Sequence, residues 1–282
     1  MSPNPDPTGP TPLSVVRNRG VTAPAGFRAS AMEAAADTDV ALALLVNEGP
    51  DLAAAGLLSS GEQRTAPQLW TQQVVTTGRL RAVLVHTGVC SPGATADLSG
   101  ASEAASADFG DTHQLAETVA STLSSWGSST GAVEVAVCAT GGSGHRAAGQ
   151  VLVAGAEEAV RELAGGLVGG TDAAWAIAGP ARVAQAALAH EAGWIVGGMV
   201  GGAGTAAAGT TCLLTCDAVA DPTTLRDALA AATADRLPLP ACTTVVLQAS
   251  GASEVTASPQ ALSAVVGAIY DDLQAQVTEG DL

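Results

Sequence analysis

The sequence predicts an α/β fold, and three observations support this. Short apolar runs of strand length recur along the chain, as in residues 40–46 (VALALLV) and 80–86 (LRAVLVH). Segments with helical spacing separate such runs, and no internal repeat interrupts the alternation. The chain has 282 residues, of which 47% are hydrophobic, so it is long enough to bury a large core. Since only 2% are aromatic, we expect small aliphatic side chains to fill that core around four bulky anchors: Trp70, Trp126, Trp175 and Trp194.

The first part of the chain predicts two strands around a helix, followed by an irregular segment. Residues 1–13 contain five prolines and predict a disordered tail, so we expect the fold to begin near Val15. The two apolar runs named above predict strands, and residues 67–77 predict a helix between them. Residues 91–109 are rich in Ser, Ala, Gly and Asp without periodicity, which predicts a loop or a flexible insertion.

The middle of the chain predicts a helix that begins with Asp111 as its N-cap and ends at Gly127. A half-buried strand at residues 133–137 follows, and it delivers Thr140 and Gly141 to its end. The remaining elements are then predicted in this order: a helix through Val160 and Leu163, a helix at 183–190, two strands within 194–217, a helix that starts at Asp221 and Pro222, a strand at 243–248, and a long helix with Ser258 as N-cap and Pro259 at its first position.

Residues 194–217 (WIVGGMVGGAGTAAAGTTCLLTCD) contain the candidate reaction centre. Two strand-like apolar runs flank a segment rich in glycine and alanine, where the backbone is open to close approach by a ligand or a scissile peptide. Thr210 and Thr211 follow this segment and are the nucleophile candidates. A threonine hydroxyl is a weak nucleophile without a neighbouring base, and cleavage of the peptide bond before it would free its own α-amino group for that purpose.

This stretch resembles the junction region of the ornithine acetyltransferases, the bifunctional glutamate N-acetyltransferases of arginine biosynthesis, which are self-cleaving N-terminal-nucleophile enzymes. The likeness covers most of the chain and includes these segments: RNRGVTAPAGFRAS (17–30), LLVNEGPDLAAAG (44–56), APQLWTQQVVTTGRLRAVLV (66–85), DTHQLAETVASTLSSWG (111–127), VEVAVCATGGSGHR (133–146), VGGM (196–199) and LLTCDAVADP (213–222). The resemblance implies an αββα sandwich in two pieces, residues 14–209 and 210–282. It also implies that the second piece is incomplete.

The activity that the resemblance implies is acetyl transfer from N-acetylornithine to glutamate through an acetyl-threonine on Thr210 or Thr211. Thr140 and Gly141 match the Thr-Gly pair whose donors form the oxyanion hole in this family. A plain turn at the end of a strand is the other interpretation of this pair. A phosphate-binding loop is disfavoured, because neither a following lysine nor GxGxxG spacing is present.

Several positions differ from the family's pattern. When residues 212–219 (CLLTCDAV) are aligned, the family's nucleophilic threonine falls on Gly209, and the family's proline is absent. The family's Thr-Thr-Asp run falls on residues 179–181 (GPA), and its lysine before the glycines falls on Gly201. Two interpretations therefore stay open: an active acetyltransferase, or a catalytically inactive homologue that serves as a binding or assembly subunit.

Composition excludes several other classes of function. A net charge of −16 and only 11 basic residues argue against binding to nucleic acid or to anionic membrane surfaces. Five cysteines without a CxxC pair exclude a zinc knuckle and a thioredoxin-like motif, and they are expected to be buried free thiols: Cys90, Cys138, Cys212, Cys216 and Cys242. The four histidines lie on separate predicted elements and are expected at the surface or at helix caps: His86, His113, His145 and His190. We expect no cofactor and no bound metal.

Three further expectations follow. Without a signal peptide or a transmembrane run, the protein should be cytoplasmic. It should act on a small amino-acid substrate if it is active, and it should form a homo-oligomer or bind a partner chain, because unpaired strand edges invite pairing. The bond between Gly209 and Thr210 should stay intact, leaving one full-length chain, because a glycine before the threonine removes backbone strain.

Overall fold

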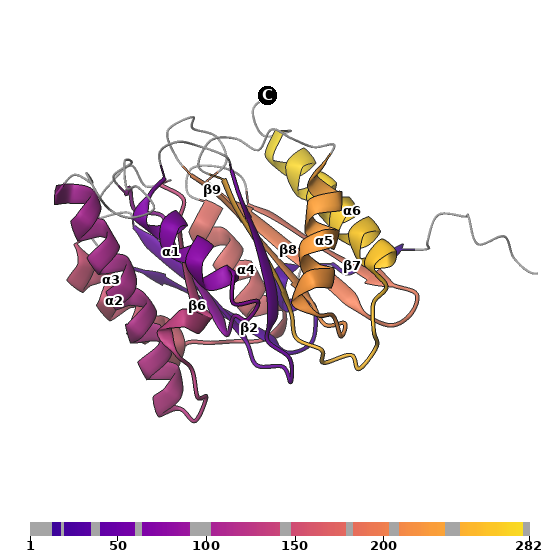
Figure 1. Cartoon of the computed structure of the whole chain (residues 1–282), viewed down its shortest axis with the longest axis horizontal. Helices are drawn as coiled ribbons and strands as arrows, with labels where there is room; N and C mark the ends of the chain where they lie inside the picture. The colour runs from indigo at the N-terminus through magenta and orange to yellow at the C-terminus, as the bar shows by residue number, and fades with distance from the viewer. Residues whose placement is uncertain are drawn as a thin grey trace, which may run out of the picture.

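The computed structural model describes residues 13–17, 20–34, 40–59, 64–90, 103–141, 148–178, 183–202, 209–234 and 243–278. Two β-sheets pack face to face, and helices cover the outer side of each sheet (Figure 1). This arrangement is the predicted αββα sandwich.

The larger sheet has six strands among the described residues, in the order β1-β7-β8-β9-β10-β4. Its strands are β1 (Leu13–Val15), β4 (Ala53–Leu58), β7 (Ala184–His190), β8 (Ile195–Gly201), β9 (Thr210–Cys216) and β10 (Thr243–Ala249). Neighbouring strands run antiparallel, except that β9 and β10 are parallel. The candidate junction therefore lies between two central strands of this sheet, β8 and β9.

The smaller sheet has the order β2-β3-β5-β6. Its strands are β2 (Phe27–Glu33), β3 (Ala41–Asn47), β5 (Ala82–His86) and β6 (Val135–Ala139). Only the β5–β6 pair of this sheet is parallel. All five residues of β5 are buried, because helices cover one face of the strand and the larger sheet covers the other. Burial on both faces explains why its sequence is continuously apolar rather than alternating.

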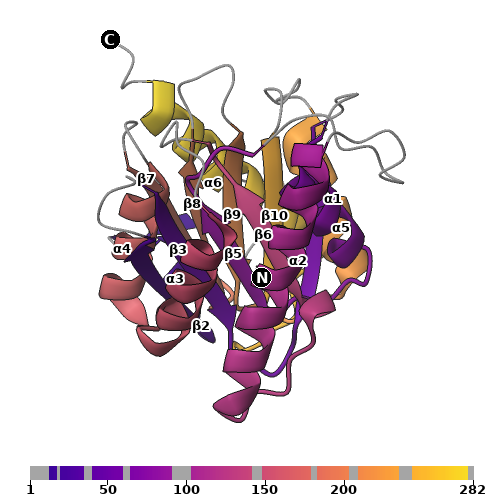
Figure 2. The ribbon, with the colours of Figure 1, turned by 90° about the vertical axis from the view of Figure 1, so that its left-hand side faces the viewer.

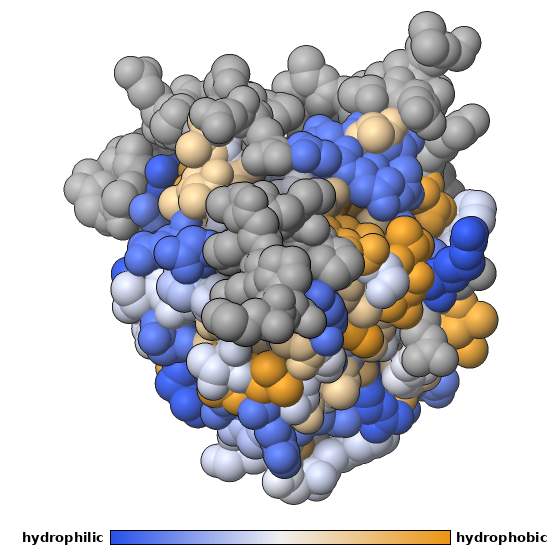
Figure 3. All heavy atoms as spheres, turned by 90° about the vertical axis from the view of Figure 1, so that its right-hand side faces the viewer, coloured by the Kyte–Doolittle hydropathy of each residue, from blue (hydrophilic) through white to orange (hydrophobic). Residues whose placement is uncertain are grey.

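Six α-helices are described. They are α1 (Ala66–Val75), α2 (Glu103–Ser125), α3 (Gly149–Arg161), α4 (Gly166–Ala178), α5 (Pro222–Thr233) and α6 (Pro259–Thr278). Helices α2 and α3 cover the smaller sheet, while α5 and α6 cover the larger one; α1 and α4 lie at opposite sides of the sandwich (Figure 2). None of the described helices is long and apolar enough to cross a bilayer. On the face shown in Figure 3, hydrophobic residues gather in a patch beside hydrophilic ones.

Most of the predicted elements are confirmed, with bounds that shift by a few residues. Those confirmed are β3, α1, β5, β6, α3, β8, β9, α5, β10 and α6, together with the C-terminal end of α2. The caps of the last helices are also as predicted: the Asp221 carboxylate accepts from Thr224 N–H at 2.8 Å, and Ser258 Oγ accepts from Ala261 N–H at 3.2 Å. Strands β1, β2 and β4 and helix α4 were not predicted, and Leu13, assigned to the disordered tail, already belongs to β1.

The helix predicted at residues 183–190 is wrong, because this segment forms β7. Its alanines favour a helix locally, but the backbone pairs with β1 on one side and β8 on the other. Gln185 also fixes the strand to α6, since its N–H donates to Gln276 Oε1 at 3.1 Å. Two ladders and a side-chain hydrogen bond therefore outweigh the helix propensity of the alanines.

The predicted loop at residues 91–109 is also partly wrong, since α2 already begins at Glu103. Asp111 thus lies inside the helix and does not cap it. Phe109 packs edge-on against Trp70, with ring centroids 6.3 Å apart, and this contact holds the first turns of α2 against α1. Residues 91–102 lie outside the described part of the chain.

The tryptophans divide into two pairs, which corrects the expectation that all four anchor the core. Trp70 and Trp194 are buried, whereas Trp126 and Trp175 are 60% and 67% exposed. Cys138, Cys212 and Cys216 are buried free thiols as predicted, and Cys90 is half-buried. Burial raises the pKa of each of the three buried thiols to about 12, so they stay protonated near neutral pH. Cys242 lies outside the described residues.

Candidate active site between the two sheets

Three strand ends converge at the junction. Gly202 follows β8 with φ of +78°, and Gly209 immediately precedes β9. A Cβ atom on Gly202 would lie 2.2 Å from Gly209 O and 2.7 Å from the Cβ of Thr140, which follows β6. The fold therefore brings Thr140, from the smaller sheet, against the start of β9 in the larger sheet.

Gly202 is expected to be intolerant of a side chain. Gly202→Ala should lower the free energy of unfolding by at least about 1 kcal/mol more than Gly193→Ala, because a clash is added to the backbone cost. Gly193 is the matched control: its φ is +93°, but a Cβ there would have no atom within 4 Å. Urea unfolding of both variants gives the comparison. Equal losses of stability would contradict the close contact at the junction.

Thr140 and Gly141, the residues predicted to form an oxyanion hole, follow the end of β6. Thr140 is fully buried, and its N–H donates to His86 O at 3.0 Å. Gly141 follows with φ of +64°, and no hydrogen bond of its N–H is found among the described residues. A hydroxyl and a backbone N–H on consecutive residues can stabilise one developing negative charge.

The two candidate nucleophiles face opposite sides of the larger sheet. Along β9, Leu213 belongs to the core between the sheets, and Thr215 Oγ1 donates to Val21 O at 2.8 Å in the same layer. Because side chains alternate along a strand, Thr211 shares this inner face, whereas Thr210 shares the outer face with Cys212, which packs with α5 and α6. Only Thr211 thus faces the layer that contains Thr140.

The Thr211 hydroxyl is buried, and within the described part of the chain it has no hydrogen bond. Thr211 is 1% exposed, and no partner for Oγ1 is found among the described residues. Its strand neighbours are Gly201 on β8 and Thr244 on β10. Gly201 offers this hydroxyl no side chain, and a Cβ there would lie 2.4 Å from Ile177 O of α4. An unpaired buried hydroxyl costs about 1–3 kcal/mol, so a native fold that retains one invites a functional explanation.

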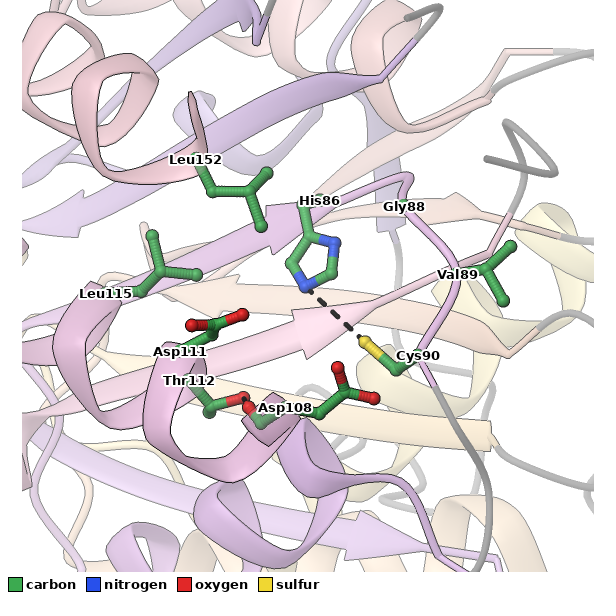
Figure 4. A pocket seen from close by; sticks show the side chains of 9 residues that line it. All are labelled: His86, Gly88, Val89, Cys90, Asp108, Asp111, Thr112, Leu115 and Leu152. Atoms are coloured by element: carbon green, nitrogen blue, oxygen red, sulfur yellow. Dashed lines mark hydrogen bonds between the residues drawn. The ribbon is translucent and has the colours of Figure 1, made fainter. Parts of the chain in front are cut away.

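A second polar cluster lies on the opposite face of the smaller sheet. His86 ends β5, and with Cys90, Asp108 and Asp111 it lines a cavity of about 20 Å³ beneath α2 and α3 (Figure 4). This volume is enough for one water molecule. Because Ala139 is paired with His86, the next residue, Thr140, points to the other face. The cavity is therefore separate from the threonine site.

His86 is neutral in this cavity, contrary to the expectation of a surface histidine. Burial lowers its pKa to about 4, and the nearby Asp108 carboxylate only partly opposes this shift. Its Nε2 lies 3.9 Å from Cys90 Sγ, and the two side chains point toward each other in Figure 4. Its Nδ1 has no hydrogen-bond partner among the described residues. The sequence carries only a weak signal for the burial of His86. The first turns of α2, which help to cover it, show no helical periodicity.

Asp111 has a structural role in the same cluster. A Cβ on Gly149 would lie 2.5 Å from its Oδ1, so the carboxylate sits against the first turn of α3, where the helix dipole favours negative charge. No group of three potential metal-ligating side chains occurs in the part of the chain that the structure describes. Of the positions that differ from the family's pattern, residues 179–181 lie outside that part.

Comparison with known proteins assigns the chain to a family. The ArgJ family's sequence model matches residues 26–281. The curated protein "Arginine biosynthesis bifunctional protein ArgJ" of Mycobacterium tuberculosis (strain ATCC 25618 / H37Rv) is 48% identical over 276 residues, which cover 93% of this chain and 66% of the relative. The protein of the same name from Streptomyces avermitilis is 40% identical over 271 residues, covering 92% of this chain and 66% of that one. The chain therefore spans just under two thirds of the length of these relatives.

Solved structures agree with this assignment. A chain of ornithine acetyltransferase from M. tuberculosis, crystallised in complex with ornithine, matches with a TM-score of 0.60 and 46% identity, covering 71% of this chain and 100% of that one. A β-aminopeptidase from a Burkholderia species matches with a TM-score of 0.61 at 11% identity, over 96% of this chain and 88% of that one, which shows a shared fold alone. On these grounds the chain belongs to the ArgJ family.

Proposed function

We propose that this chain transfers an acetyl group from N-acetylornithine to glutamate, with Thr211 as the residue that carries the acetyl group. The observation that supports this most directly is the Thr211 hydroxyl, which is buried without a partner among the described residues and faces the layer between the sheets where Thr140 lies. The ornithine acetyltransferase of M. tuberculosis that matches this chain supports the same reaction class.

The first half of the reaction forms an ester on Thr211. Its Oγ1 attacks the acetyl carbonyl of N-acetylornithine while its proton passes to a base. The Thr140 hydroxyl and Gly141 N–H donate to the resulting oxyanion. The carbon–nitrogen bond then breaks, and ornithine leaves with the proton on its amine.

The second half returns the enzyme to its starting state. The amine of glutamate attacks the acetyl ester, and the same two donors meet the second oxyanion. The bond between the acetyl carbon and Thr211 Oγ1 breaks, the hydroxyl regains its proton, and N-acetylglutamate leaves. No cofactor is required for either half of this reaction.

The base that the proposal requires is the α-amino group of Thr211, freed by cleavage of the Thr210–Thr211 bond. The Gly209–Thr210 bond is a poor alternative, because the Thr210 side chain is on the outer face of the sheet, away from Thr140. The expectation that the Gly209–Thr210 bond stays intact is kept, but this proposal replaces the expectation of one full-length chain with cleavage one bond later. The division at the junction, here moved by one residue so that the second piece begins at Thr211, is part of the same proposal.

Acetyl transfer by point variants tests the assignment. Thr211→Ala should lower the rate of transfer from N-acetylornithine to glutamate by at least about a thousandfold, because the acetyl carrier is lost. Thr210→Ala is the matched control and should keep most of the activity. Intact-mass measurement of the unmodified protein should find a fragment that begins at Thr211.

Two results would overturn the proposal. Equal activity of the Thr211→Ala variant and the unmodified protein would exclude Thr211 as carrier. A single full-length chain without transfer above a no-protein control would leave the inactive homologue as the function.

The cellular setting belongs to the same proposal. The free thiols of Cys90, Cys138, Cys212 and Cys216 support a reducing compartment, and we place the reaction in the cytoplasm. A homo-oligomer or a partner chain stays a prediction, supported by the apolar patch of Figure 3 and to be measured by light scattering.

A further inference from the structure

An open groove runs along the outer edge of the smaller sheet, and neither Thr140 nor Thr211 lines it. Residues 29–32 of β2 form its floor, Glu158 and Glu162 lie on the α3 side, and Val168 and Asp172 lie on the α4 side. Its volume is about 370 Å³. Figure 2 shows β2, α3 and α4 together on this side of the molecule.

The two edge strands of the smaller sheet, β6 and β2, differ in how their outward backbone groups are hydrogen-bonded. At the β6 edge, α1 satisfies the outward backbone groups of Val137. Thr71 Oγ1 donates to Val137 O at 2.7 Å and accepts from Val137 N–H at 3.1 Å. At the β2 edge, Ala29 forms two backbone hydrogen bonds with Ala164 of 2.9 and 3.0 Å, and no other outward backbone pairing of β2 is found within the described residues. A free sheet edge is a template for an added strand.

Two further residues of β2 present their backbone to the groove side. Backbone groups alternate in direction along an antiparallel strand, so Ala31 and Glu33 point their N–H and C=O outward as Ala29 does. Neither residue has a backbone partner on that side among the described residues. An extended segment could therefore continue the pairing that Ala164 begins.

The charge of the groove selects among possible occupants. Glu162 and Asp172 form no ion pair among the described residues, while Glu158 is paired with Arg161 at 2.7 Å. With these acids and a net charge of −16, a second copy of this chain would bring like charges together. A basic segment would instead be attracted.

The apolar surface beside these acids favours arginine. Val168 and Trp175 are 60% and 67% exposed, and with Asp172 they follow the i, i+4, i+7 spacing of one stripe on α4. A guanidinium group can stack on an indole ring while it pairs with a neighbouring carboxylate. An aliphatic arginine stem can also cover the valine.

We propose that this groove receives an extended, arginine-containing segment of a partner protein, which adds a strand at β2 and places its arginines on Glu162, Asp172 and Trp175. The main-chain pairing supplies affinity, and the acids and Trp175 select the side chains. This interaction is independent of the acetyl-transfer site, which lies between the sheets.

A designed peptide of alternating arginine and valine tests this with the full chain. Calorimetry should detect binding that weakens about tenfold in the double variant Glu162→Gln/Asp172→Asn and in Trp175→Ala. The matched control is Glu191→Gln/Asp227→Asn, which removes two exposed acids elsewhere and should bind as the unmodified chain does. N-methylation of the peptide's backbone along one edge should abolish binding, because it removes the donors that pair with β2.

Three outcomes would overturn the proposal. The peptide could fail to bind, or the two double variants could lose affinity equally, which would indicate general attraction to an acidic protein. Light scattering could instead show that the chain forms an oligomer and that Trp175→Ala converts it to a monomer, which would indicate self-association through this groove. Acetyl transfer measured on the same variants separates this test from the proposed function, since both double variants should retain it.

Discussion

Thr211→Val should make the protein more stable and inactive at the same time. Valine has nearly the shape of threonine but lacks the hydroxyl, whose oxygen is buried without a partner among the described residues. Removing an unsatisfied buried polar group should raise the free energy of unfolding by about 1 kcal/mol. Acetyl transfer should fall to background, because the carrier oxygen is gone.

Thr215→Val is the matched control on the same strand and the same face. Its hydroxyl donates to Val21 O at 2.8 Å, so this change leaves a buried carbonyl unpaired and should cost about 1–2 kcal/mol. Urea unfolding of both variants should show a higher free energy of unfolding for Thr211→Val and a lower one for Thr215→Val. If Thr211→Val lowered stability as Thr215→Val does, the Thr211 hydroxyl would have a structural partner and would not be held ready for reaction.

Acid should weaken the fold through His86. Its pKa is lowered by burial from 6.5 in the unfolded chain to about 4 in the native protein. Between these values the unfolded chain binds a proton that the native protein does not, so stability falls as the pH drops from 6.5 toward 4. The total effect is about 3 kcal/mol, reached below pH 4 and absent above 6.5.

His86→Leu should remove this component of the pH dependence, since leucine fits the apolar contacts of Leu115 and Leu152 in the cavity. Unfolding free energies at pH 7 and pH 4.5 would be compared between this variant and the unmodified protein. His113→Gln, on the exposed surface of α2, is the control and should behave as the unmodified protein does. If the His86→Leu variant lost as much stability between pH 7 and pH 4.5 as the unmodified protein does, groups other than His86 would cause the acid sensitivity.

Most helices and strands could be predicted because apolar runs and helix caps are local signals, whereas the four-layer arrangement was implied by the family resemblance. Asp221 and Ser258 cap their helices as the pattern indicated. The errors fall where distant contacts decide: β7 is held as a strand by β1, β8 and Gln276, and the start of α2 is held by the contact of Phe109 with Trp70. Such contacts leave no periodicity in the segment itself.

For the candidate site, the sequence named the residues, and their roles stay predictions. Thr140 and Gly141 were identified from the resemblance and the paired threonines from the segment that precedes them, but alternation alone could not say which of Thr210 and Thr211 faces inward. The pairing of Thr211 with Gly201 decides this, and that register is a property of the folded sheet. The buried His86 was missed because α2 covers it with turns that were not predicted.

The strand order of the larger sheet has a mechanical consequence for a cleaved chain. Strands β9 and β10, which follow the junction, lie between β8 and β4, which precede it. A cut before Thr211 would thus leave two polypeptides interleaved within one sheet, joined by the β8–β9 ladder on one side and the β10–β4 ladder on the other. Neither polypeptide could dissociate without breaking the hydrogen bonds of both ladders. The newly formed amino terminus would therefore stay at the position where cleavage produced it.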